Sequence, residues 1–143
     1  PLYHYFVHSG SAMGTIKEEE LKKTQNAMLK TKEYILSVKN GEKMMPVLEL
    51  MAFIHFGISL PLRFSDIKNI SIIQTIDGVK SFLNKNFPQW NRSPLLSTRY
   101  VIQHKYRLWK PMIVLWLYNM GLFTVFLRLY KWLTSRLKID IKW

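Results

Sequence analysis

The longest apolar stretch of the chain covers residues 111–127, in which no side chain is charged. Basic and aromatic residues close both of its ends, as they do at the two surfaces of a lipid bilayer. The 21-residue step from Trp109 to Tyr130 corresponds to about 31 Å of α-helix, close to the ~30 Å thickness of the hydrocarbon layer. The pattern therefore predicts one transmembrane helix over residues 106–133.

Two sets of flanking side chains would hold this helix at the membrane surfaces. Long basic side chains extend their charged heads to the lipid phosphates, and Trp and Tyr prefer the boundary between hydrocarbon and water. The predicted head-group contacts are Arg107, Lys110, Arg128 and Lys131. The predicted interfacial anchors are Tyr106, Trp109, Tyr130 and Trp132. Residues 91–110 and 128–143 each hold five Lys or Arg, so the charge bias leaves the orientation open.

Asn119 and Gly121 interrupt the apolar run near its middle. An Asn within a membrane span usually bonds a neighbouring helix, and a Gly permits close approach of two backbones. We therefore expect Asn119 and Gly121 to lie on a face that packs against a partner helix.

A second apolar stretch covers residues 44–62, and its polar members are Glu49, His55 and Ser59. Its nineteen residues could just cross the hydrocarbon layer, although an ionised carboxylate is costly there. This stretch is a candidate second transmembrane helix, and the alternative is a buried or interfacial helix. If it spans, Glu49 and His55 are expected to face protein or water as intramembrane polar contacts.

Residues 1–43 read as a soluble N-terminal arm followed by an amphipathic helix over residues 15–39. Thr15 and Glu18 fit a capping box at its start, and Asn40-Gly41 supplies the residues that end helices. Leu21, Met28 and Ile35 form a narrow apolar stripe, which indicates docking on a partner or packing within the same chain.

Residues 63–105 read as a peripheral segment, and residues 134–143 as a basic C-terminal tail. In the peripheral segment a short amphipathic helix is predicted from the helical spacing of four apolar residues, namely Ile72, Ile76, Val79 and Leu83. We expect it to lie on a membrane surface or to cover a partner. The tail ends in an alternating pattern typical of an extended arm. The predicted class is thus an all-α, membrane-anchored protein with amphipathic helices and extended termini.

The charge of the chain lies mostly in its second half. The whole chain has 21 Lys and Arg against 9 Asp and Glu, a net charge of +12, and residues 63–143 hold fourteen basic against three acidic residues. Such an excess of positive charge beside apolar runs favours a bilayer with anionic head groups as the binding partner. A nucleic acid or an acidic protein surface is the next alternative. Bound cardiolipin or another anionic phospholipid would suit the positive charge.

The sequence lacks the motifs of catalysis and cofactor binding. It contains no cysteine, no phosphate-binding glycine loop and no zinc-protease motif. His4 and His8 are four residues apart but have no nearby acidic or third histidine ligand for a metal. We therefore expect no enzymatic activity, no cofactor and no small-molecule substrate.

Small size, basic flanks and missing catalytic motifs together favour a non-catalytic accessory subunit of a large energy-transducing membrane complex. The respiratory chain or ATP synthase of the mitochondrial inner membrane is the expected setting, with other subunits and membrane lipid as partners. The alternative is a basic RNA-binding component of an organellar ribosome, against which the uncharged run 111–127 argues. A weaker alternative is a protein-import or membrane-shaping factor.

Overall fold

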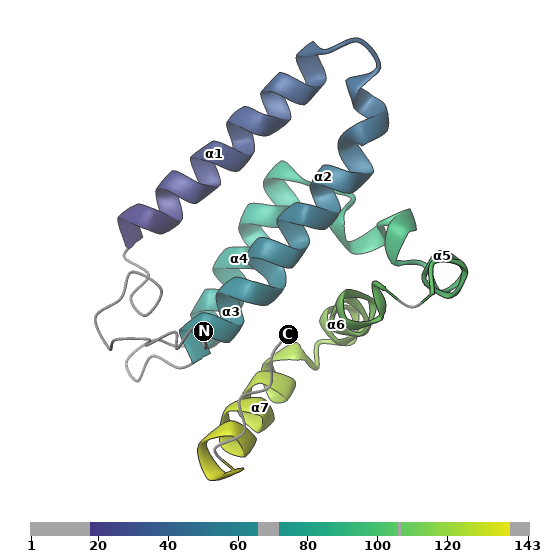
Figure 1. Cartoon of the computed structure of the whole chain (residues 1–143). Helices are drawn as coiled ribbons and strands as arrows, with labels where there is room; N and C mark the ends of the chain where they lie inside the picture. Colours follow the sequence, from purple (N-terminus) through teal and green to yellow (C-terminus); the bar gives the residue numbers. More distant parts are fainter. Residues whose placement is uncertain (1–17, 66–71, 106, 138–143) are drawn as a thin grey trace, which may run out of the picture.

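The computed structural model describes residues 18–65, 72–105 and 107–137, and every regular element in these ranges is helical (Figure 1). The longer helices are α1 (Glu18–Ser37), α2 (Met45–Ala52), α4 (Ile72–Asn86), α6 (Trp109–Asn119) and α7 (Phe123–Leu137). The shorter ones are η1 (Gly41–Met44), η2 (Phe53–Ser59), α3 (Leu60–Ser65), η3 (Trp90–Arg92), η4 (Pro94–Leu96) and α5 (Thr98–Gln103). The all-α prediction is confirmed for the described residues.

A tight turn joins α1 to η1, and after this turn α2 runs back along α1 (Figure 1). Asn40 takes the left-handed conformation at a φ of 63°, a role that the sequence pattern assigned to Gly41. Gly41 is required for a different reason, since a Cβ there would lie 1.6 Å from the carbonyl oxygen of Ile35. The predicted end of this helix is therefore right, but the two residues have different roles from those expected.

The stripe of Leu21, Met28 and Ile35 on α1 packs, half-buried, against the core of the same chain. Of the two interpretations of this stripe, packing within the chain is the one the structure supports. The capping box at Thr15 and the two N-terminal histidines lie outside the described residues.

The centre of the core is the continuous helical run α2–η2–α3. Its middle part, η2, is a π-helix, a wider turn that displaces the hydrogen-bond ladder by one residue. The carbonyl oxygen of Gly57 in η2 accepts a 2.7 Å hydrogen bond from the buried hydroxyl of Tyr118 in α6. Phe53 and Trp90 complete an aromatic cluster with Tyr118, with ring centroids 5.3 to 5.8 Å apart. This cluster fixes α6 on the central helix.

Helix α4 matches the predicted amphipathic helix. Ile76, Val79 and Leu83 are buried, while Asp77 and Lys85 are exposed. The buried side packs on η2 and α3 of the same chain, so neither a membrane surface nor a partner is needed to cover it. The indole N–H of Trp90 donates to the side chain of Asn84 at 2.8 Å and ties the following turn to α4.

The prediction of one unbroken helix over residues 106–133 is wrong. The chain forms α6 and α7 instead, and between them Gly121 adopts a φ of 71°. The N–H of Gly121 bonds the carbonyl of Tyr118 at 3.1 Å, and the N–H of Leu122 bonds the carbonyl of Leu117 at 2.8 Å. These two bonds define a Schellman motif, the commonest way in which glycine ends a helix.

The basic C-terminal tail was predicted to begin at residue 134, and its extended-arm pattern lies in residues 139–143. Helix α7 continues to Leu137, because its apolar and polar positions keep the helical period beyond residue 133. Residues 138–143, which carry the alternating pattern, lie outside the described residues.

Candidate membrane interface

Helix α6 is apolar on both of its sides. Val114, Leu115 and Tyr118 face the core and are at most 7% exposed. On the opposite side, a second stripe at helical spacing points outward, and it consists of Trp109, Ile113, Trp116 and Met120. Trp116 is 63% exposed, so a large apolar surface has no cover from the described residues. Outward apolar surface of this kind marks an interface with lipid or protein.

Helix α7 extends this surface beyond the turn. Phe123 and Leu127 are buried, whereas Val125, Leu129 and Trp132 are each more than half exposed. We name the whole set the α6–α7 apolar surface, and it consists of Trp109, Ile113, Trp116, Met120, Leu122, Val125, Leu129, Trp132 and Leu133.

The charge around the α6–α7 apolar surface has one sign. Residues 78–137 contain ten Lys or Arg and no Asp or Glu. Of the four predicted head-group contacts, Arg107 and Arg128 are exposed and Lys110 and Lys131 are half-buried. Arg107 precedes α6, Lys110 lies in its first turn, and the other two lie within α7. The guanidinium of Arg136 lies 5.7 Å from the ring centroid of Trp132, a cation–π contact. Cations beside exposed Trp residues are typical of a surface that meets anionic head groups.

The four predicted interfacial anchors differ in how far the structure exposes them. Trp109 and Trp132 are exposed on the α6–α7 apolar surface, as their role requires. Tyr130 is half-buried and stacks on Phe126 at 6.2 Å within the same helix. Tyr106 lies outside the described residues. The two Trp residues are therefore the anchors that the structure makes accessible.

The packing of Gly121 against a partner helix stays a prediction, and within the described part of this chain no helix supplies that contact. A Cβ at Gly121 would meet nothing within 4 Å, so no backbone approaches it closely. Asn119 is exposed at the end of α6, and its side chain lines a cavity beside Trp116. The turn after α6 explains a glycine at position 121, and a Gly after the last helical turn is the sequence signal for such an ending.

Glu49 is buried, at 5% exposure, among residues of its own chain. Its predicted role as an intramembrane polar contact depends on a membrane span and stays a prediction. Its carboxylate accepts a 3.3 Å hydrogen bond from the backbone N–H of Gln89. Burial raises the pKa of Glu49, against the opposing effects of that hydrogen bond and of the positive charge of Lys32. Lys32 itself donates to the carbonyl of Asn86 at 2.5 Å. Together Glu49 and Lys32 hold the turn after α4 to α1 and α2.

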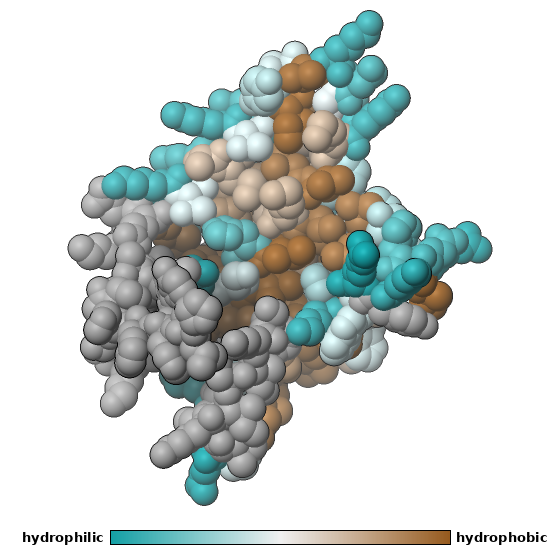
Figure 2. All heavy atoms as spheres, in the orientation of Figure 1, coloured by the Kyte–Doolittle hydropathy of each residue, from teal (hydrophilic) through white to brown (hydrophobic). Residues whose placement is uncertain are grey.

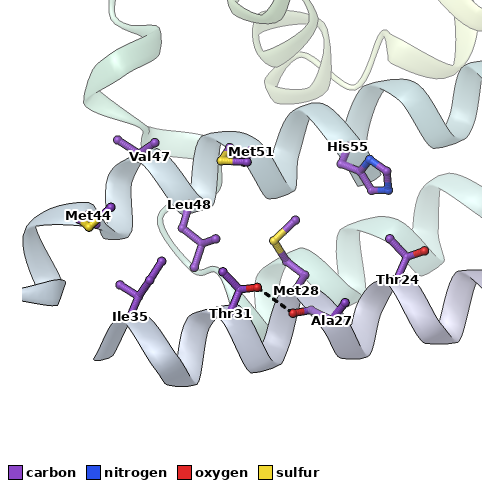
Figure 3. A pocket seen from close by; sticks show the side chains of 10 residues that line it. All are labelled: Thr24, Ala27, Met28, Thr31, Ile35, Met44, Val47, Leu48, Met51 and His55. Carbon is purple, nitrogen blue, oxygen red and sulfur yellow. Dashed lines mark hydrogen bonds between the residues drawn. The ribbon is translucent and has the colours of Figure 1, made fainter. Parts of the chain in front are cut away.

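His55 is exposed at the rim of a groove between α1 and α2 (Figure 3). Partial burial lowers the pKa of His55, and the nearby charge of Arg63 lowers it further. Along the groove, Met44 of η1 and Val47 and Met51 of α2 lie opposite α1 and are about half exposed. Figure 2 shows hydrophobic residues in a band over the middle of the molecule, with hydrophilic side chains at its edges. The sequence pattern did not predict this groove.

One helix in the described part of the chain, Gly41–Arg63, is long and apolar enough to cross a membrane, which by itself indicates membrane association only weakly. It includes the predicted second span, whereas the predicted main span is divided. Of the most apolar 18 residues of the Gly41–Arg63 helix, 56% are buried inside the chain. Among the same described residues, no group of three or more His, Asp or Glu could hold a metal ion.

Comparisons with protein-family models, with curated proteins and with solved structures give no match for this chain. Function is therefore inferred from the surfaces of the molecule.

Proposed function

We propose that this chain is a non-catalytic accessory subunit of a large energy-transducing membrane complex, attached to the membrane through the α6–α7 apolar surface. The observation that carries the proposal is this surface itself, with Trp116 63% exposed, in a region of ten basic residues and no acid. Exposed apolar area and one-signed positive charge are the two contributions that bind amphipathic helices to anionic bilayers.

The helix lengths favour attachment at the membrane surface over crossing. At 1.5 Å per residue, α6 (11 residues) and α7 (15 residues) are about 16 and 22 Å long, short of the ~30 Å hydrocarbon layer. The Gly41–Arg63 helix is long enough, but α1 packs along it and carries exposed charges such as Lys30 and Glu33. Because such charges are costly in hydrocarbon, we treat this helix as the core of a folded domain.

The second part of the proposal is the location of the complex, the mitochondrial inner membrane. It depends on composition, since a net charge of +12 suits a membrane rich in cardiolipin or another anionic phospholipid. The exposed apolar groove between α1 and α2 is a second surface of the kind found in proteins that contact neighbours. Both features fit a subunit that stabilises the assembly of the respiratory chain or ATP synthase.

The charge also favours a second candidate, an RNA-binding component of an organellar ribosome. Lys and Arg side chains bind phosphates, and exposed Trp residues can stack on bases. Against it, the outward stripe of α6 is uniformly apolar from Trp109 to Met120, whereas RNA-binding surfaces interleave basic and aromatic residues. A protein-import or membrane-shaping factor would share the membrane attachment and differ in its partners.

The test is purification of the tagged chain from its native membranes in mild detergent, followed by mass spectrometry of the proteins that comigrate on a native gel. Respiratory-chain or ATP synthase subunits in fixed ratio are the expected result. Ribosomal proteins with RNA would overturn the proposal in favour of the second candidate. Translocase subunits would favour the import factor.

A further inference from the structure

A cavity of about 430 Å³ lies between α6 and the segment that leads into α5. Its volume falls within the ~300–1,000 Å³ range of small-molecule pockets. The side chains that line it come from Leu96, Ser97, Thr98, Met112, Ile113, Leu115, Trp116 and Asn119.

The walls of the cavity are apolar and its edge is polar. Leu96 and Leu115 are buried, at 4% and 7% exposure, and Met112 is half-buried. Thr98 and Asn119 are exposed, and within the described part of the chain neither side chain has a hydrogen-bond partner. The Thr98 hydroxyl and the Asn119 amide can each donate to a carbonyl oxygen. The Ser97 hydroxyl is already engaged, since it donates to the carbonyl of Pro94 at 2.8 Å.

The cavity is continuous with the α6–α7 apolar surface. Ile113 and Trp116 belong to both, so one side of each contacts the cavity and the other meets the surroundings. A lipid in a leaflet that meets this surface could therefore extend a hydrocarbon chain past Trp116 without crossing water. Arg99, the residue after Thr98, is exposed and adds positive charge to the same segment.

We infer that this cavity binds one acyl chain of a membrane glycerophospholipid, with Thr98 and Asn119 donating to its ester carbonyl oxygens. The inference rests on the proposed function, because the lipid reaches the cavity from a bilayer held against the α6–α7 apolar surface. An apolar lining with few polar groups at one end matches the chemistry of this ligand, an ester joined to a long hydrocarbon.

The experiment uses the full chain on vesicles of phosphatidylcholine and cardiolipin that contain a phosphatidylcholine with a photoactivatable diazirine at the end of one acyl chain. After irradiation, mass spectrometry of peptides identifies the labelled residues. The expected result is label on Leu96 and Leu115, which are buried and line the cavity. Label restricted to exposed residues such as Trp109 and Trp132 would overturn the inference.

A cavity-filling variant gives an independent readout. Thr98→Trp places a large ring in the cavity, so we expect labelling of Leu96 to fall at least about fivefold while vesicle binding stays within about twofold. Thr31→Trp is the control, because Thr31 is also exposed and lines the other groove. Unchanged labelling in folded Thr98→Trp would contradict the inference, and if that variant unfolds, the wild-type labelling pattern decides alone.

The two proposals fail in distinguishable ways. Vesicle binding without label on Leu96 or Leu115 overturns the acyl-chain site and leaves membrane attachment intact. Absence of vesicle binding by the wild-type chain overturns both.

Discussion

Replacement of Trp116 by alanine tests the membrane interface where the structure exposes it most. A Trp side chain has up to about 250 Å² of surface, so 63% exposure leaves about 160 Å² in water. At about 25 cal/mol per Å², complete transfer to an apolar phase would contribute about 4 kcal/mol. A side chain at the head-group boundary is only partly withdrawn from water, so we expect roughly half of this, about 2 kcal/mol.

A loss of 2 kcal/mol corresponds to about a 30-fold weaker partition coefficient. The assay is cosedimentation of the purified chain with vesicles of phosphatidylcholine and cardiolipin, over a range of lipid concentrations. Tyr34→Ala is the matched control, because Tyr34 is an equally prominent aromatic, 70% exposed, on α1. Its partition coefficient should change less than twofold. If Trp116→Ala and Tyr34→Ala bind vesicles equally well, the α6–α7 apolar surface is not the membrane interface.

Three further predictions concern the fold. Gly121→Ala should lower the free energy of unfolding by about 1 kcal/mol, because its φ of 71° disfavours a Cβ. Gly78→Ala is its control, since Gly78 lies inside α4 with open space around it, and this change should stabilise by about 0.5–1 kcal/mol. Urea unfolding measures both, and equal effects would contradict the assigned turn. Tyr118→Phe should cost about 1–2 kcal/mol in the same assay, because it leaves the Gly57 carbonyl without its 2.7 Å donor; no loss would show that this bond contributes nothing. Burial raises the pKa of Glu49 in the folded chain, so the folded state binds the proton of this carboxyl more tightly than the unfolded state does. Protonated Glu49 therefore contributes to stability. The contribution is complete below the unfolded pKa near 4.5 and is lost as pH rises through the raised pKa of the folded state. Glu49→Gln should remove that part of the pH dependence of unfolding, and an unchanged pH profile would contradict the assignment.

Several elements could be predicted from local pattern alone. The spacing of Ile76, Val79 and Leu83 identifies α4 and its buried side, because a period of 3.6 residues places these side chains on one face wherever the helix packs. The same argument identified the inner stripe of α1. In both cases the pattern fixed which face is buried but left open whether the chain itself or a partner covers it.

The membrane helix was mispredicted because composition was given more weight than backbone geometry. An uncharged run bounded by Trp and basic residues fits a span, but it also fits two short helices that each bury one side and expose the other. Gly121 distinguishes these alternatives, since it can adopt a positive φ at little cost and end α6. The same type of helix ending was predicted at Asn40-Gly41 but not at Gly121.

The sequence by itself determined that this chain is helical, strongly basic in its second half and rich in apolar surface. Those properties follow from local periodicity and from charge, which do not depend on how distant segments meet. Only the tertiary structure decided that the 41–63 helix is the core, that Glu49 is buried against Gln89, and that Trp109 and Trp116 remain outside. The physical reason is that burial is a property of pairs of segments: the hydroxyl of Tyr118 and the carbonyl of Gly57 are 61 residues apart in the chain and meet only when α6 packs on η2.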